Sequence, residues 1–165
     1  MEKLTKEYIE TFAQTIFENY LARQKERQPE EIIEYPTWES LPSSLKDSNR
    51  RQAAAIPDKL SVINCYLDSG YKDAVTSNEV DSFTDEEIEA ISEYEHEIWV
   101  EERRAGGWKL GAEKDIENKI SPYLIPYDQL ADEIKELDRD AVANILPLVT
   151  EVGLRVFRRI PNNDC

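Results

Sequence analysis

The sequence contains few of the residues from which metal and catalytic centres are usually built. Its 165 residues include one histidine, two cysteines and five glycines. A single histidine with Cys65 and Cys165 cannot supply a His-rich or Cys-rich metal cluster, and two cysteines do not form a disulfide framework. The glycines form no phosphate-binding loop, because residues 106–111 lack its spacing. We therefore expect no metal, no cofactor and no catalytic residue marked by a motif.

Long apolar runs and excess positive charge are also absent. No apolar run is long enough to cross a bilayer, and the N-terminal residues lack the apolar core of a signal peptide. The chain has 20 basic and 35 acidic residues, which gives a net charge of −15. Such a surface repels phosphate backbones and anionic lipid, which argues against nucleic-acid and membrane partners. We expect a reduced, cytoplasmic protein in which a local basic pocket can still hold a small anion.

What the chain does have is material for a hydrophobic core. Hydrophobic residues make up 40 % of the sequence and aromatic residues 9 %, so we expect one folded domain over residues 1–165. Apolar residues recur mostly at helical spacing, and capping residues mark two of the helix starts. The expected elements are helices over 5–27, 45–55 (continuing beyond Pro57), 84–104 and 130–151, a loop with a short hairpin over 108–127, and a closing strand over 154–160.

An internal duplication organises these elements. The segment that begins at Trp38 matches the segment that begins at Tyr127 when it is displaced by 89 residues, and the preceding helices match at a displacement of 79. We therefore expect a mainly α-helical tandem of two helix–loop–helix units, 5–70 and 84–160, joined by a connector over 71–83. Each unit would bury its apolar face against the other around a pseudo-twofold axis, with short β-strands or a hairpin added.

Two groups of residues are candidates for ligand recognition. His96, Trp99 and Arg103 share one face of the third expected helix, where they are either core and salt-bridge residues or an aromatic and cationic recognition face. Arg50 and Arg139 follow Asn49 and Asp138 at equivalent positions of the two units. We expect Asn49 and Asp138 to cap helices. The two arginines either form local salt bridges or clamp an anion from symmetric sides.

An ordered set of motifs resembles the RyR domain, the repeat found in ryanodine receptors and in bacterial proteins. These motifs are Glu95-His96-Glu97-Ile98-Trp99, Arg103, Gly107-Trp108, Gly111, Pro122, Leu124-Ile125-Pro126-Tyr127, Leu130, Asp138-Arg139, Trp38-Glu39-Ser40-Leu41-Pro42 and Asn49-Arg50-Arg51-Gln52-Ala53. The resemblance implies a mainly α-helical tandem of pseudo-symmetric units that serves as a regulatory module. Tyr20 and Phe17 stand where the second unit has Trp99 and His96, so the first unit departs from the pattern.

The leading hypothesis is a non-catalytic, intracellular module that binds a planar, nucleotide-like small anion in a cleft between the units. Tyr20 and Trp99 would supply stacking surfaces, Arg50, Arg103 and Arg139 positive charge, and His96 and Trp108 the border of the site. One alternative is a protein-interaction module that uses the acidic helix 79–102 or the Trp108 loop. Another is a hydrolase of a nucleotide derivative with His96 as the base. The oligomeric state is left open.

Overall fold

The computed structural model describes residues 4–69 and 78–159 and is mainly helical, with two small sheets. The first half of the chain forms α1 (Lys6–Arg27), α2 (Ser43–Ala54), α3 (Ile56–Val62) and β1 (Cys65–Ser69). The second half forms α4 (Asp85–Ala105), β2 (Lys109–Leu110), β3 (Ile120–Ser121), the 3-10 helix η1 (Tyr127–Gln129), α5 (Asp132–Ala143), α6 (Ile145–Glu151) and β4 (Leu154–Arg158). Most of the expected connector, 71–83, lies outside the described residues.

The two long helices begin and end where the sequence predicts. The Thr5 hydroxyl accepts a hydrogen bond from the backbone N–H of Tyr8 and caps α1. Thr84 and Glu87 form the predicted capping box of α4 by exchanging hydrogen bonds between side chain and backbone. At its other end α4 ends at Gly106, and Gly107 has a φ of 89°, a left-handed conformation that suits glycine.

Three local predictions are wrong. The helix expected over 130–151 is divided at Asn144 into α5 and α6, because the ring of Pro147 is incompatible with a continuous helix through the carbonyl of Ala143. Asn49 and Asp138 lie inside α2 and α5 instead of capping them. In the segment expected to form a hairpin, 108–127, β2 and β3 pair in parallel instead, and antiparallel pairing is limited to one bridge between Asp115 and Ile120.

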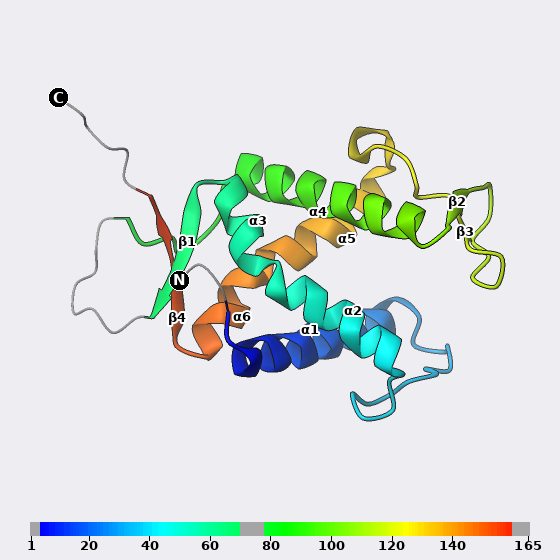
Figure 1. Cartoon of the computed structure of the whole chain (residues 1–165), viewed down its shortest axis with the longest axis horizontal. Helices are drawn as coiled ribbons and strands as arrows, with labels where there is room; N and C mark the ends of the chain where they lie inside the picture. The colour runs from blue at the N-terminus through cyan, green and yellow to red at the C-terminus, as the bar shows by residue number, and fades with distance from the viewer. Residues whose placement is uncertain (1–3, 70–77, 160–165) are drawn as a thin grey trace.

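The two sheets lie at opposite ends of the molecule (Figure 1). β1 and β4 pair antiparallel with Cys65 opposite Arg158 and Ser69 opposite Leu154. The segment that follows the gap in the described residues lies along the other edge of β4, where the N–H of Val80 donates to the carbonyl of Val156 at 2.8 Å. β4, at the end of the second half, therefore pairs on one edge with β1, from the end of the first half. On its other edge it pairs with the segment at the start of the second half.

The element order repeats between the two halves. Adding 89 to the bounds of α2, α3 and β1 gives the bounds of α5, α6 and β4, and adding 79 to the start of α1 gives the start of α4. Ring contacts repeat in the same places: Phe17 meets Trp38 at 6.1 Å between centroids, and His96 meets Tyr127 at 6.2 Å. The pseudo-twofold axis itself stays a prediction.

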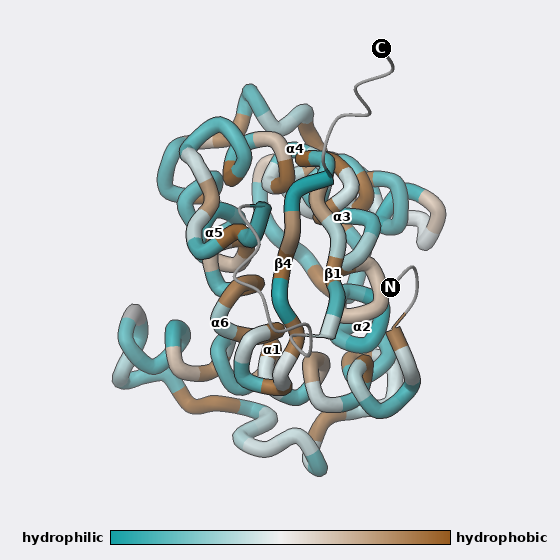
Figure 2. The backbone as a smooth tube through the Cα atoms, turned by 90° about the vertical axis from the view of Figure 1, so that its left-hand side faces the viewer, coloured by the Kyte–Doolittle hydropathy of each residue, from teal (hydrophilic) through white to brown (hydrophobic). Residues whose placement is uncertain are grey.

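The helices share a core across the halves. α1 packs on α2 and α4 on α5 within each half, while α3 packs on α4 and α6 contacts α1 between the halves. Figure 2 shows the β1–β4 pair in front of the helices, with α4 toward its upper end and α1 toward its lower end. The core includes Phe12, Leu60, Ile91 and Val149, which are fully buried. Among the helices of the described residues, none has the length and apolarity to span a membrane.

Candidate functional site

A cavity of about 560 Å³ lies between α4, α5 and the C-terminal end of α2. We call it the Trp99 cavity. Four of the seven predicted site residues line it: His96, Trp99 and Arg103 from α4, and Trp108 from the loop that follows. Trp99 and Arg103 follow one another at helical spacing, which places them along one side of α4. The recognition face predicted from the sequence thus borders a cavity.

His96 has a structural contact on one side of its ring. Its Nε2 lies 2.7 Å from the carbonyl oxygen of Ile125, so this nitrogen carries a hydrogen and donates it. The ring is buried and stacks on Trp99 at 5.6 Å between centroids, with 23° between the planes. His96 therefore ties the loop before η1 to α4 and fixes the orientation of Trp99.

Arg103 lies between two tryptophan rings. Its Cζ is 5.5 Å from the ring centroid of Trp99 and 5.1 Å from that of Trp108. The contact of Trp108 follows from the turn after α4, because Gly106 and Gly107 let the chain reverse and the Trp108 N–H donate to the Arg103 carbonyl at 2.9 Å. Across residues 4–69 and 78–159, no carboxylate pairs with Arg103. Cation–π contacts use the face of a guanidinium, so its in-plane N–H donors stay available to an anion.

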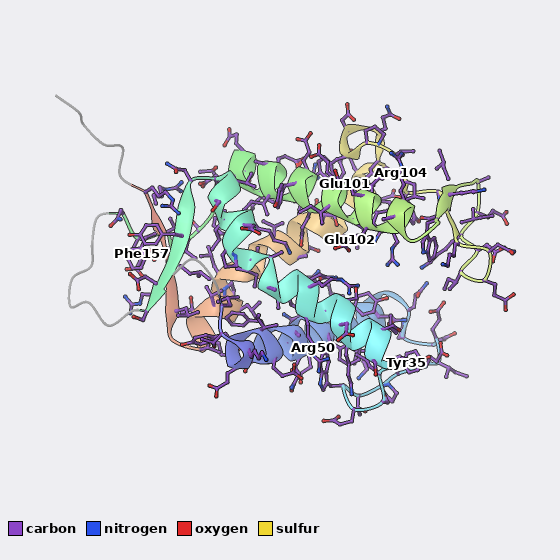
Figure 3. All side chains as sticks on the ribbon, viewed as in Figure 1. Tyr35, Arg50, Glu101, Glu102, Arg104 and Phe157 are labelled. Carbon is purple, nitrogen blue, oxygen red and sulfur yellow. The ribbon has the colours of Figure 1, made fainter. Side chains whose placement is uncertain are left out.

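Arg50 and Arg139 differ from the expectation that they clamp an anion in the cleft. Arg50 donates to Glu10 at 2.7 and 3.0 Å and to Asp47 at 2.9 Å. Arg139 likewise donates to Glu89 at 2.5–3.2 Å and to Glu136 at 3.1 Å. Neither lines the Trp99 cavity. Figure 3 shows Arg50 beside α1 and α2, on the other side of the molecule from the labelled residues of α4.

These ion pairs tie the helices of each half together. The hydrogen bond from Arg50 holds the pKa of Glu10 below its usual value, and the bond from Arg139 does the same for Glu89. Burial, together with the bond to Glu89, raises the pKa of Tyr127 to about 12. The local salt-bridge interpretation of the two arginines, which the sequence left open beside the clamp, describes their contacts.

Tyr20 lies in a different cavity from Trp99. This second cavity has a volume of about 360 Å³ and lies between α1, the C-terminal end of α2, α3, α5 and α6. We call it the Tyr20 cavity. Tyr20 is 62 % exposed there. The two cavities share a wall that includes Lys59 and Glu95. Tyr20 and Trp99 therefore line two adjoining cavities, and the prediction that both stack on one ligand stays a prediction.

Sequence reasoning missed the polar group in that wall. Lys59, on α3, is 5 % exposed and pairs with Glu95 of α4 while donating to the carbonyl of Gln52 at 3.4 Å. Asp138 lines the Trp99 cavity beside this pair. Burial, with a further contribution from Glu95, raises the pKa of Asp138 to about 7, although Lys59 opposes the shift. The only sequence signal was an isolated lysine within the apolar pattern of α3.

The described part of the chain holds no group of three or more His, Cys, Asp or Glu residues that could bind a metal ion. The site brings together a guanidinium between two aromatic rings, a buried lysine paired with a glutamate and a half-buried carboxyl group. A family model for the RyR domain matches residues 75–158, which is over half of the 165 residues. This match includes α4 to β4, and hence His96, Trp99, Arg103, Trp108 and Asp138.

Proposed function

The chain belongs to the RyR domain family, and from that premise we propose that it is a non-catalytic regulatory module whose Trp99 cavity binds a nucleotide-like small anion. The family membership supports a regulatory or interaction module in general. The nucleotide-like ligand and its binding in the Trp99 cavity are what we propose beyond the family membership. It places the ligand in the Trp99 cavity, which residues of both halves line, and it keeps His96, Trp99, Arg103 and Trp108 of the predicted site.

The observation that carries this proposal is the state of Arg103. The net charge of the chain is −15, and the arginines at the two repeated positions, Arg50 and Arg139, are paired with carboxylates. Arg103 instead has its faces against Trp99 and Trp108 and its donors free at the edge of a cavity. A guanidinium that is held in place loses little conformational freedom when it binds phosphate or carboxylate.

The cavity also fits a nucleotide in size and in the character of its walls. Its volume of about 560 Å³ lies in the range of small-molecule sites. Arg51, on α2, adds a second cation to its lining, and the ring of Trp99 offers apolar surface to a planar group. A planar anion can therefore place its charge at Arg103 and its ring system along the wall formed by Trp99.

Calorimetric titration with a panel of nucleoside mono-, di- and triphosphates tests the proposal. We expect Arg103→Gln to weaken binding at least tenfold, because one charge-assisted contact to an anion is lost. The matched control is Arg104→Gln, which makes the same charge change one residue further along α4, outside the Trp99 cavity. Equal affinity of the Arg103→Gln variant and the wild type, or no binding by any member of the panel, would contradict the proposal.

A protein-interaction module is the second candidate function. It is favoured by exposed apolar side chains near Trp108: Leu110 is 59 % exposed and Ile116 is 68 % exposed. The acidic residues of 79–102 would provide the charged part of such an interface, and binding would weaken with salt. A nucleotide-derivative hydrolase is the weakest alternative, since one ring nitrogen of His96 is already used by Ile125. Turnover that depends on His96 would favour it.

A further inference from the structure

We propose that Asp138, at the inner end of the Trp99 cavity, forms a subsite for a hydrogen-bond donor, and that the cavity selects heterocycles carrying an exocyclic amino group. This inference rests on the proposed function, since it concerns the other end of the same ligand. The anion site at Arg103 does not distinguish one planar anion from another, whereas a donor subsite at Asp138 determines which planar anions the cavity prefers.

The carboxyl group of Asp138 is unpaired among the described residues. Asp138 lines the Trp99 cavity, and it has no hydrogen-bond or ion-pair partner within the described ranges. The nearby cation, Lys59, is already used by Glu95 and by the carbonyl of Gln52. An ionised carboxyl group only accepts hydrogen bonds, so the complement of this unpaired group is an N–H or O–H donor.

The charged groups around Asp138 come from three helices and one loop that line the same cavity: Lys59 from α3, Glu95, Glu102 and Arg103 from α4, Arg51 from α2, and Lys119. Of these groups, only Lys59 and Glu95 act on the charge of Asp138, and they neutralise one another. Asp138 is therefore left without a cation of its own among them. Half-burial disfavours its charge, and this cost is relieved when a ligand donates a hydrogen bond to it.

The spacing of the side chains along α4 sets the length of the ligand. Glu95, beside Asp138, and Arg103 are eight residues apart on α4, and a rise of 1.5 Å per residue makes this about 12 Å. Trp99 lies midway between them. A ligand that reaches both ends therefore has its donor far from its anionic group, with a planar part between. The amino group on the base of a nucleoside monophosphate has this placement, whereas the ribose hydroxyl groups lie next to the phosphate.

The pH dependence of binding follows from the same geometry. The pKa of Asp138 in the free protein is about 7, and a donor from the ligand favours the ionised carboxylate. Binding therefore lowers this pKa, and by linkage the affinity rises as the pH increases through neutrality. A ligand that lacks the donor gives no such rise beyond the titration of its own phosphate.

The experiment compares three probes by calorimetric titration at pH 6, 7 and 8: adenosine monophosphate, its analogue without the 6-amino group, and its 2′,3′-dideoxy analogue. We expect the two amino-bearing probes to bind about tenfold more tightly at pH 8 than the analogue without the amino group. We expect Asp138→Asn to remove the pH-dependent part of this preference. Asp140→Asn is the matched control, because Asp140 lies on α5 outside the Trp99 cavity.

The outcomes separate this inference from the function on which it rests. Equal binding of all three probes, still weakened by Arg103→Gln, overturns the donor subsite and leaves the anion site standing. A loss of affinity confined to the dideoxy probe would also overturn it. Failure of every probe to bind overturns both. As a check that does not depend on a variant folding, NMR titration of the Asp138 carboxyl group in the wild type must show a lower pKa with adenosine monophosphate bound.

Discussion

At the residue scale, the arginines of this protein differ in what their guanidinium groups contact. Arg50 and Arg139 each donate to one carboxylate on the neighbouring long helix and to another one turn away on their own helix. Among the described residues, the guanidinium of Arg103 lies over two aromatic rings and has no carboxylate partner. The first two arginines therefore hold helices together, and Arg103 is the cavity residue on which we propose that recognition depends. Sequence equivalence had suggested a role for the paired arginines, and the structure shows instead that equivalent positions make equivalent ion pairs.

Asp138 gives a residue-scale prediction for stability. Burial raises the pKa of Asp138 from 3.8 to about 7 on folding, so the cost of burying its charge is absent below about pH 4, develops between about pH 4 and 7 and is constant above that. We expect Asp138→Asn to raise the free energy of unfolding by about 2 kcal/mol at pH 8 and to leave it unchanged at pH 4.

Urea denaturation at the two pH values measures this difference. Asp140→Asn serves as the control, since it changes the same charge on the same helix outside the cavity. A variant that is destabilised at pH 8 would show that the carboxylate of Asp138 makes a favourable contact within the folded chain.

At the scale of the element, capping residues define the start of each long helix and prolines divide the shorter ones. Pro57 and Pro147 each lie near the start of a short helix, α3 and α6, directly after a longer one has ended. A proline ring excludes the carbonyl four residues earlier from the helix ladder, and this is a local effect that can be identified from sequence. The elements expected from the sequence include this break at Pro57 but not at Pro147, because strong apolar periodicity over 130–151 suggested a single helix.

The capping box of α4 gives the element-scale prediction. Thr84→Ala removes the acceptor of the Glu87 N–H, a bond of 3.2 Å, and leaves the reciprocal bond from the backbone N–H of residue 84 to the Glu87 carboxylate in place. We expect the free energy of unfolding to fall by about 1 kcal/mol. Thr84→Ser keeps the hydroxyl group and should retain most of the stability. A midpoint of urea denaturation that is the same for Thr84→Ala and the wild type would show that the cap contributes nothing measurable.

At the scale of the whole molecule, the two halves are joined through their interior. α3 of the first half packs on α4 of the second, and this contact contains the buried pair of Lys59 and Glu95. The same pair lines both the Trp99 cavity and the Tyr20 cavity. The interior of the fold thus places a polar group at the position where both cavities meet.

Removing the lysine tests how this group holds the halves together. Lys59→Met leaves Glu95 and Asp138 as two half-buried carboxyl groups without a cation, so we expect a loss of about 3 kcal/mol at pH 8. The double variant Lys59→Met/Glu95→Gln removes both charges of the pair and should recover most of that loss. Thermal denaturation followed by circular dichroism compares the variants. Equal stability of the single and double variants would mean that the cost comes from packing rather than from unpaired charge.

The sequence by itself determined the features that depend on neighbours along the chain. Helical spacing, the capping residues Thr5 and Thr84 and the glycines after α4 act within one or two turns, so the long helices, their caps and the closing strand were predicted correctly. The face formed by Trp99 and Arg103 was also predictable, because residues three and four apart on a helix share a side.

Only the tertiary structure decided which side chains from distant segments meet. It paired Arg50 with Glu10 and Arg139 with Glu89, and it buried Lys59 against Glu95. It also placed Tyr20 and Trp99 in two adjoining cavities whose shared lining includes that ion pair. An acidic chain offers every basic residue many possible partners, and sequence spacing does not choose among them. The choice depends on how the helices of the two halves pack, which brings together residues as far apart as Arg139 and Glu89 or Lys59 and Glu95.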